Sequence, residues 1–126
     1  MERTFPPLTT SQKQLLEKGI QLFNAGQFFD CHEVLEEAWV EASGEQKIFL
    51  QGLIQAAVSL HHLKRKNLVG ARRLLDAGIQ KLGNFTPHQE SLDVANLLEH
   101  LGRLQSQIDS GELADDWQPP QIRFGE

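Results

Sequence analysis

Apolar residues recur every three or four positions along most of the chain, which is the spacing that places them on one face of an α-helix. Valine, isoleucine and threonine are scarce beside leucine, alanine, glutamine and glutamate, and no stretch alternates apolar and polar residues as a half-buried strand would. Turn and capping residues divide this pattern into five predicted helices, at about residues 11–25, 28–42, 44–66, 68–83 and 87–109. The connections, of about two to five residues, predict antiparallel neighbours. We therefore expect residues 1–126 to form one domain, a compact all-α bundle.

Capping residues support the predicted starts of three helices. Ser11 with Gln14, and Ser43 with Gln46, have the spacing of a capping box, in which each side chain accepts a hydrogen bond from the other residue's backbone N–H. Asn67 is a favourable N-cap for the fourth predicted helix. These residues place the starts of the first, third and fourth helices.

The end of the chain divides into a helix and a tail. The segment Thr86–Gln89 predicts the start of the fifth helix, because it offers an N-cap, a proline in the first turn and a glutamine at the third helical position. Residues 110–126 contain two consecutive prolines and cannot continue that helix. We expect an extended tail whose apolar residues pack against the bundle or a partner; these are Trp117, Ile122 and Phe124.

Two of the predicted helices carry information about packing. The third is apolar almost all round, which predicts a central position with neighbours on most sides. The fourth has Gly78 on its inward face, where glycine costs about 1 kcal/mol relative to alanine. Close approach of a neighbouring helix would explain this glycine. The other residues predicted to face inward are Leu68, Ala71, Leu75, Ile79 and Leu82.

Composition and charge narrow the class of protein. The 17 acidic residues outnumber the 12 basic ones and the formal net charge is -5, so the overall field does not favour nucleic acid or an anionic membrane. No stretch approaches the roughly 20 apolar residues of a membrane span, and residues 1–7 lack the apolar core of a signal peptide. The single cysteine, Cys31, excludes an intrachain disulfide framework. We therefore expect a cytoplasmic protein.

Polar and apolar side chains share faces in the second and third predicted helices. On the second helix His32 and Glu36 are four residues apart and Glu33 and Glu36 are three apart, so each pair meets on the helix surface. If the two helices form an antiparallel hairpin, their polar stripes could face each other and form one buried cluster. The residues of this predicted cluster are His32, Glu33, Glu36, Trp39, Gln51, Gln55 and His62.

Three roles are compatible with such a cluster. The first is a hydrogen-bond network that fixes the packing and binds nothing. The second is a metal-dependent hydrolase, in which His32 and Glu36 ligate a divalent metal and Glu33 activates a water. This set lacks the second histidine of the zincin motif, and the amides of the third helix are poor ligands for transition metals. The third is a groove for a small molecule or peptide. The apolar wall of that groove would be Phe28, Phe29 and Trp39.

A basic segment is the second candidate for a site. Six of the twelve basic residues lie within residues 64–81. Arg65, Arg72 and Arg73, close to the helix start at Asn67, could bind a phosphate or nucleotide. The alternative is a solvated face that complements the acidic second helix of another subunit. Because the third helix and the tail offer more apolar surface than one small bundle needs, we also expect a homo-oligomer, a dimer.

Two blocks of sequence carry a family resemblance. They are His-Glu-x-x-Glu-x-x-Trp at 32–39, preceded by Phe23 and Gly26, and Gln-Gly-Leu-Ile-Gln at 51–55. Together they resemble the bacterial family known as domain of unknown function 309, over roughly residues 15–83. Cys31 stands where an alanine is more typical. The resemblance implies a small helical bundle and no established activity. We therefore expect a binding or structural module rather than an enzyme, with no cofactor unless the His32–Glu36 pair holds a divalent metal.

Overall fold

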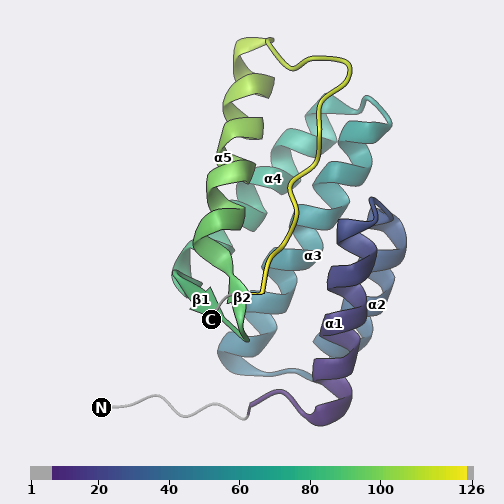
Figure 1. Ribbon diagram of the computed structural model, residues 1–126, viewed down its shortest axis with the longest axis vertical. Helices are drawn as coiled ribbons and strands as arrows, with labels where there is room; N and C mark the ends of the chain where they lie inside the picture. Colours follow the sequence, from purple (N-terminus) through teal and green to yellow (C-terminus); the bar gives the residue numbers. More distant parts are fainter. Residues whose placement is uncertain (1–6, 125–126) are drawn as a thin grey trace.

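A computed structural model describes residues 7–124 as five α-helices, one 3-10 turn and a small β-hairpin (Figure 1). The elements are α1 (Thr10–Asn24), α2 (Phe28–Glu41), α3 (Gly44–Lys64), α4 (Leu68–Leu82), η1 (Gly83–Phe85), β1 (His88–Gln89), β2 (Leu92–Asp93) and α5 (Val94–Ser110). The all-α prediction is confirmed, and α1–α4 begin and end within two residues of the predicted bounds. Residues 1–6 and 125–126 lie outside the described part, and so does most of the segment 1–7 on which the expectation about a signal peptide rests.

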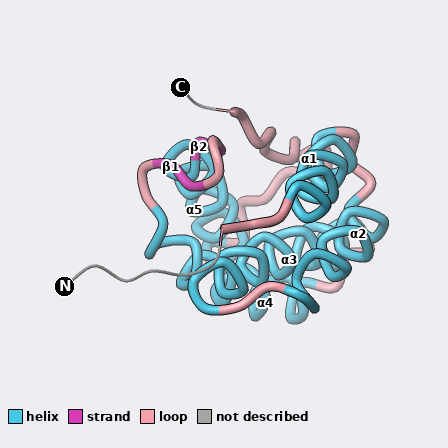
Figure 2. The backbone as a smooth tube through the Cα atoms, turned by 90° about the horizontal axis from the view of Figure 1, so that it is seen from below, coloured by secondary structure: helices cyan, strands magenta, loops and turns pink. Residues whose placement is uncertain are grey.

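The helices pack as successive antiparallel neighbours with α3 in the middle (Figure 1). Seen along the bundle, α1 and α2 lie on one side of α3, and α4 and α5 lie on the other (Figure 2). The central position predicted for this helix is confirmed, because α3 packs against both α2 and α4 and ten of its 21 residues are buried. They include Phe49, Leu50, Leu53, Ile54, Ala57, Leu60 and Leu63.

The capping box of α1 lies two residues before the predicted one. The Gln12 backbone N–H donates to the Thr9 hydroxyl at 3.1 Å, and the Thr9 N–H donates to the Gln12 side chain at 2.8 Å. The buried Gln12 amide also donates to the Ala38 carbonyl of α2 at 3.1 Å. The predicted Ser11–Gln14 box is wrong, because Thr9 and Gln12 have the same spacing and Gln12 gains a buried partner on the neighbouring helix.

The predicted capping box of α3 is also absent. Ser43 is the N-cap residue, but its hydroxyl makes no capping hydrogen bond. Gln46 bonds the hairpin instead, donating to Glu90 at 3.2 Å and accepting from Gln89 at 3.3 Å. A long-range contact therefore replaces the local one. The predicted cap of α4 does form, because the Asn67 side chain accepts from a backbone N–H at 3.0 Å.

The fifth helix begins at Val94, and the prediction that it begins at residue 87 is wrong. Residues 88–89 and 92–93 form the antiparallel hairpin, and the Asp93 side chain caps α5 by accepting from a backbone N–H at 3.0 Å. The buried Leu92 forms an isolated bridge with Phe124 near the end of the chain. This contact between distant segments keeps the hairpin extended, which the local capping pattern did not indicate.

Gly78 allows α3 and α4 to approach backbone to backbone. A Cβ atom at Gly78 would lie 3.1 Å from the Gly52 carbonyl oxygen and 3.2 Å from the Ala56 nitrogen, both on α3. Gly52 is in turn covered by Leu82, whose side chain would lie 3.0 Å from an added Cβ. The neighbour expected beside Gly78 is therefore α3, and the expectation is confirmed.

Residues 111–124, which we call the tail, run back along α5 in the opposite direction and lie between α5 and α1 (Figures 1 and 2). Gly111 makes the turn with a positive φ of 74°. Ile122 is buried, and its backbone exchanges two hydrogen bonds with the Asn24 side chain, at 2.7 and 2.9 Å. The tail therefore packs against the bundle, although Phe124 remains 54% exposed.

Candidate functional site

The polar residues of α2 lie at the surface and not in a buried cluster. Glu36 is 54% exposed, His32 is 21% exposed and Glu33 is exposed. His32 Nε2 lies 3.4 Å from Glu36, and His32 Nδ1 lies 3.2 Å from the Phe29 carbonyl oxygen. The buried position expected for these carboxylates is wrong, because another face of α2 packs on the core. That face consists of Phe28, Cys31, Leu35 and Ala38.

Two of the predicted polar residues of α3 have partners outside α2. Gln55 accepts from the Lys81 ammonium of α4 at 3.0 Å. His62 Nδ1 lies 3.4 Å from the Asn67 side-chain amide, and Gln51 is half-buried. Within the predicted cluster, the described contacts therefore join only the local pair on α2.

Trp39 lies at the edge of the bundle. Its ring is half-buried and the Lys47 ammonium lies 4.3 Å from the ring centroid, which is a cation–π contact. The indole N–H is buried without a hydrogen-bond partner in residues 7–124, so it does not reach Glu36. Trp39 is a packing residue of this surface and not part of a polar network.

His61 of α3, which the predicted cluster did not include, lies close to His32 through a shared contact with Phe29. The Phe29 ring centroid lies 5.2 Å from that of His32 and 5.4 Å from that of His61 on α3. Desolvation lowers the pKa of His61, and nearby positive charge, first that of Arg65, lowers it further.

Across the described residues, no group of three or more His, Cys, Asp or Glu is arranged to hold a metal ion.

Cys31 is a buried free thiol. Desolvation by the surrounding core raises its pKa to about 12. Since the thiolate is the reactive form of cysteine, Cys31 is a core residue and not a nucleophile.

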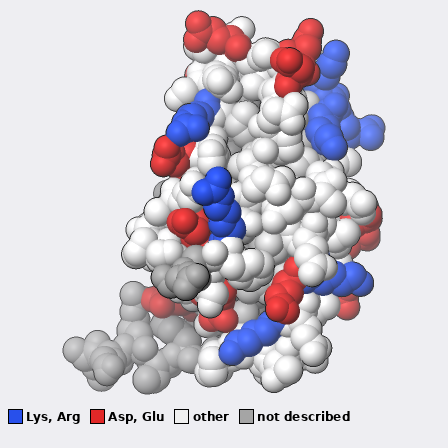
Figure 3. Space-filling model, in the orientation of Figure 1, with Lys and Arg blue, Asp and Glu red and all other residues white. Residues whose placement is uncertain are grey.

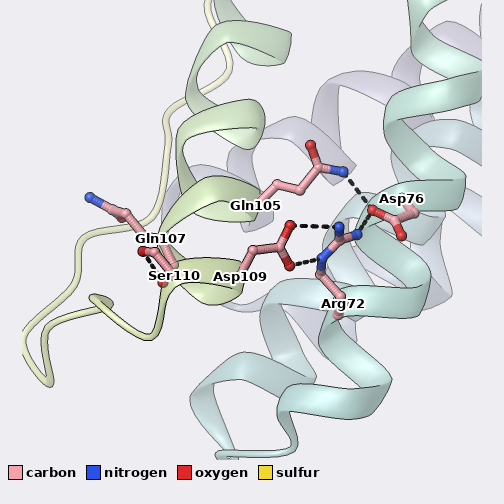
Figure 4. A network of polar contacts seen from close by, with 6 residues as sticks. All are labelled: Arg72, Asp76, Gln105, Gln107, Asp109 and Ser110. Carbon is pink, nitrogen blue, oxygen red and sulfur yellow. Dashed lines mark hydrogen bonds and ion pairs between the residues drawn. The ribbon is translucent and has the colours of Figure 1, made fainter.

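Arg72, one of the predicted anion-binding residues, joins α4 to α5 (Figure 4). Its Nη2 donates to Asp109 at 2.7 Å, its Nε donates to the same carboxylate, and it also forms an ion pair with Asp76. The Gln105 amide donates to Asp76 from α5. The hydrogen bond between Arg72 and Asp109 raises the pKa of Arg72 and lowers the pKa of Asp109. The guanidinium therefore neutralises protein carboxylates.

A surface groove runs beside this network, between α4 and the tail. It consists of two adjoining depressions that share Leu68 and Ile108. The first, of about 270 Å³, lies between the α3–α4 turn and the tail and includes Leu113 and Trp117. The second lies along α4 and includes Val69. We call the two together the α4–tail groove.

The groove has apolar walls and a basic edge. Leu68 is 50% exposed and Val69 is 74% exposed, so the prediction that Leu68 faces the core is wrong. Lys64 and Lys66 line the first depression and Arg73 lines the second. Figure 3 shows basic side chains gathered at the upper right, over the turn between α3 and α4. Two consecutive apolar residues directly after a helix cap, next to a basic run, were the signal for this groove in the sequence.

No helix in the described residues is both long and apolar enough to cross a lipid bilayer. This agrees with the expectation from the hydropathy of the chain.

Comparisons with known proteins support the family resemblance. Residues 16–74 match the model of the family described as "Domain of unknown function (DUF309)". The "Uncharacterized protein YpuF" of Bacillus subtilis (strain 168) is 33% identical over 101 residues, which are 78% of this chain and 58% of that protein. An "Uncharacterized protein" of Aquifex aeolicus (strain VF5) is 24% identical over 114 residues, which are 90% of this chain and 32% of that protein.

The chain thus spans less than two thirds of the length of either relative. The matched family segment runs from α1 into the first half of α4 and includes Leu68 and Val69. The resemblance to this family, expected over roughly residues 15–83, is confirmed over residues 16–74.

Proposed function

We propose that this protein is a cytoplasmic binding module and that its α4–tail groove receives an acidic, amphipathic segment of a partner protein. The observation that carries the proposal is the exposure of Leu68 and Val69, at 50% and 74%, beside the half-buried Trp117. Apolar residues exposed around a depression are typical of interaction sites. An amphipathic helix binds in such a groove through its apolar face.

The charges around the groove favour an acidic occupant. Lys66 and Arg73 lie along it, together with Lys64, whose ammonium also donates to the Gly26 carbonyl at 3.1 Å. Asp115 is the acidic residue of the first depression. The acidic residue of the second depression is already paired with Arg72. Opposite charges around an interface steer the partner and fix its orientation. Glu and Asp on the polar face of the occupant would therefore be preferred to Lys and Arg.

The contacts of the polar residues favour a peptide-binding module over two alternatives, a metal-dependent hydrolase and a phosphate-binding module. A hydrolase would need His32, Glu33 and Glu36 around one metal, but Glu33 is exposed and the contact recorded is between the other two. A phosphate-binding module would use Arg72, whose guanidinium is occupied by two carboxylates.

The cytoplasmic location is a further part of the proposal, and a homodimer is the competing use of the same groove. The free thiol of Cys31 suits a reducing compartment. A second copy of the chain is the rival occupant of the groove, because α2 presents an acidic surface that complements the basic edge. The exposed acidic residues of α2 are Asp30, Glu33, Glu36, Glu37 and Glu41.

Trp117 provides a reporter inside the groove once the second tryptophan is removed by Trp39→Phe. The probes are two synthetic helical peptides of about 16 residues. Both have leucine on one face; the opposite face carries only Glu in one peptide and only Lys in the other. We expect the Glu peptide to change Trp117 emission in a saturable way and to bind about tenfold or more tightly than the Lys peptide. Its affinity should fall as salt is raised, because exposed charges are screened.

Leu68→Asp should abolish binding of the Glu peptide. Val40→Asp is the matched control, since it adds the same charge at another exposed apolar position, 64% exposed on α2. Equal losses in the two variants, or equal binding of the two peptides, would contradict the proposal. Sedimentation equilibrium tests the rival occupant: a dimer that Leu68→Asp dissociates, without affinity for either peptide, would assign the groove to a second copy.

A further inference from the structure

A separate cavity lies between α5 and the tail. Its volume is about 340 Å³ and it shares only Gln107 with the α4–tail groove. We call it the His100 cavity. Its polar lining comes from His100, Arg103 and Gln107 of α5 and from Gln118, Gln121 and Arg123 of the tail.

The tail wall of this cavity is held in place by hydrogen bonds to other elements. The Gln121 side chain donates to the Asn24 carbonyl at 3.1 Å, and the backbone of Ile122 is bonded to the Asn24 side chain. The Arg123 carbonyl accepts from the Asp93 N–H at 2.8 Å. The opposite wall is an α-helix. The cavity is therefore preformed, which reduces the entropy lost when a ligand binds.

The lining gives the cavity a positive charge. Arg103 and Arg123 supply two guanidinium groups, and none of the nine lining residues is Asp or Glu. Arg103 Nη2 is bonded to Glu99 one turn away, but both side chains are 61% exposed. An exposed pair of this kind contributes little to stability, and it leaves the other N–H donors of Arg103 available to a ligand.

His100 adds an imidazole whose tautomer is not fixed by a hydrogen bond at Nδ1 within residues 7–124. Its Nδ1 is buried and has no hydrogen-bond partner in the described part of the chain. A histidine's tautomer is set by the hydrogen bond that one of its nitrogens makes. Because no described group fixes Nδ1, the Nε2 atom is able to carry a proton and donate it to an acceptor in the cavity.

We propose that the His100 cavity binds a small organic anion. The carboxylate or phosphate group accepts from Arg103 and Arg123, since a guanidinium presents paired N–H donors that match both groups, and from His100 Nε2. The apolar part of the ligand lies against Leu104 and Pro120, which complete the lining. This site is independent of the peptide groove in its residues, apart from Gln107, and in its ligand.

Isothermal titration of the full chain with four probes tests the proposal. The probes are phenyl phosphate, benzoate, inorganic phosphate and benzyl alcohol. We expect one saturable site for at least one of the two aromatic anions, inorganic phosphate about tenfold weaker because it lacks the apolar part, and no binding of the neutral alcohol. The tighter of the two anions defines the anionic group that the cavity prefers. Absence of saturable binding by both would overturn the proposal.

Two cavity variants and one control variant locate the site. Arg123→Gln should weaken binding about tenfold or more, whereas Arg73→Gln, an exposed arginine on the α4–tail groove, should leave it unchanged. An equal loss in both variants would overturn the assignment to this cavity. Arg103→Gln repeats the test on α5, at a side chain that is 61% exposed and is not bonded to the tail residues 111–124. Peptide binding to the groove should persist in Arg123→Gln, so failure of one proposal is distinguishable from failure of the other.

Discussion

Arg72 and Asp109, which lie 37 residues apart, form a two-point hydrogen-bonded ion pair that joins α4 to α5. Arg72 lies within the segment matched by the family model and Asp109 lies beyond it. The pair therefore connects the family segment to the helix that walls both the peptide groove and the His100 cavity.

This ion pair should make stability depend on acid pH. The hydrogen bond from Arg72 lowers the pKa of Asp109 below its ordinary value of 3.8. A lowered pKa stabilises the fold above the unfolded-state value, and that contribution is lost as pH falls through the folded-state value. Asp109→Asn should therefore be less stable than wild type at neutral pH, and the difference in urea midpoint should shrink below pH 3.8. Asp116→Asn, in the exposed part of the tail, is the control; a gap that is constant with pH in Asp109→Asn would contradict the prediction.

Gly78→Ala should destabilise the protein by about 1–3 kcal/mol, as overpacking does. The added Cβ would meet the backbone of Gly52 and Ala56 at 3.1 and 3.2 Å, and backbone atoms inside a helix cannot move independently. Gly102→Ala is the matched control on α5, because no atom lies within 4 Å of its added Cβ. It should be stabilising by up to about 1 kcal/mol through helix propensity. Chemical denaturation measures both, and equal effects would argue against close α3–α4 packing.

Val69 should be dispensable for folding although it is apolar. Since it is 74% exposed, Val69→Ser should change the unfolding free energy by less than about 0.5 kcal/mol. Leu75 lies on the buried face of α4 and is 1% exposed. Leu75→Ala should therefore lower the unfolding free energy by about 2–5 kcal/mol. Urea denaturation of the two variants compares them directly. A large loss in Val69→Ser would mean that the α4–tail groove is part of the core.

Cys31 should resist thiol reagents in the native state. Its burial raises its pKa to about 12, and a thiol without thiolate character is a poor nucleophile. Ellman's reagent should therefore react in denaturant and not in native buffer. Ser110→Cys, at an exposed position, should react at once and serves as the control. Rapid labelling of the wild-type protein in native buffer would show that the core around Cys31 opens to solvent.

The sequence predicted best what depends on neighbouring residues. The helices α1–α4 follow from apolar spacing and short connections, and the His32–Glu36 contact follows from a separation of four residues on one helix. The start of α5 was mispredicted because the extended hairpin depends on Leu92 meeting Phe124. Distant pairings of this kind leave no periodic signal.

The candidate sites were harder to predict for a related reason. Because α3 is apolar on nearly all sides, its sequence does not define how the helix is rotated, and Gln55 faces Lys81 of α4 instead of α2. The α4–tail groove is lined by Leu68 and Trp117, which are far apart in the sequence. The His100 cavity is lined by α5 and by residues from 118–123. Each site depends on where the tail returns, which the helical periodicity does not specify.

The Asn24–Ile122 hydrogen bonds close a chain separation of 98 residues. Contacts so distant form late, because the entropy of closing the loop is lost before the contact compensates for it. The tail should thus be the last segment to dock during folding. It should also be the first to detach in the native state, while the five helices remain packed together. Amide hydrogen exchange at Ile122 would then report a partial opening, and a ligand in the His100 cavity would slow that exchange without changing the rate at the centre of α3.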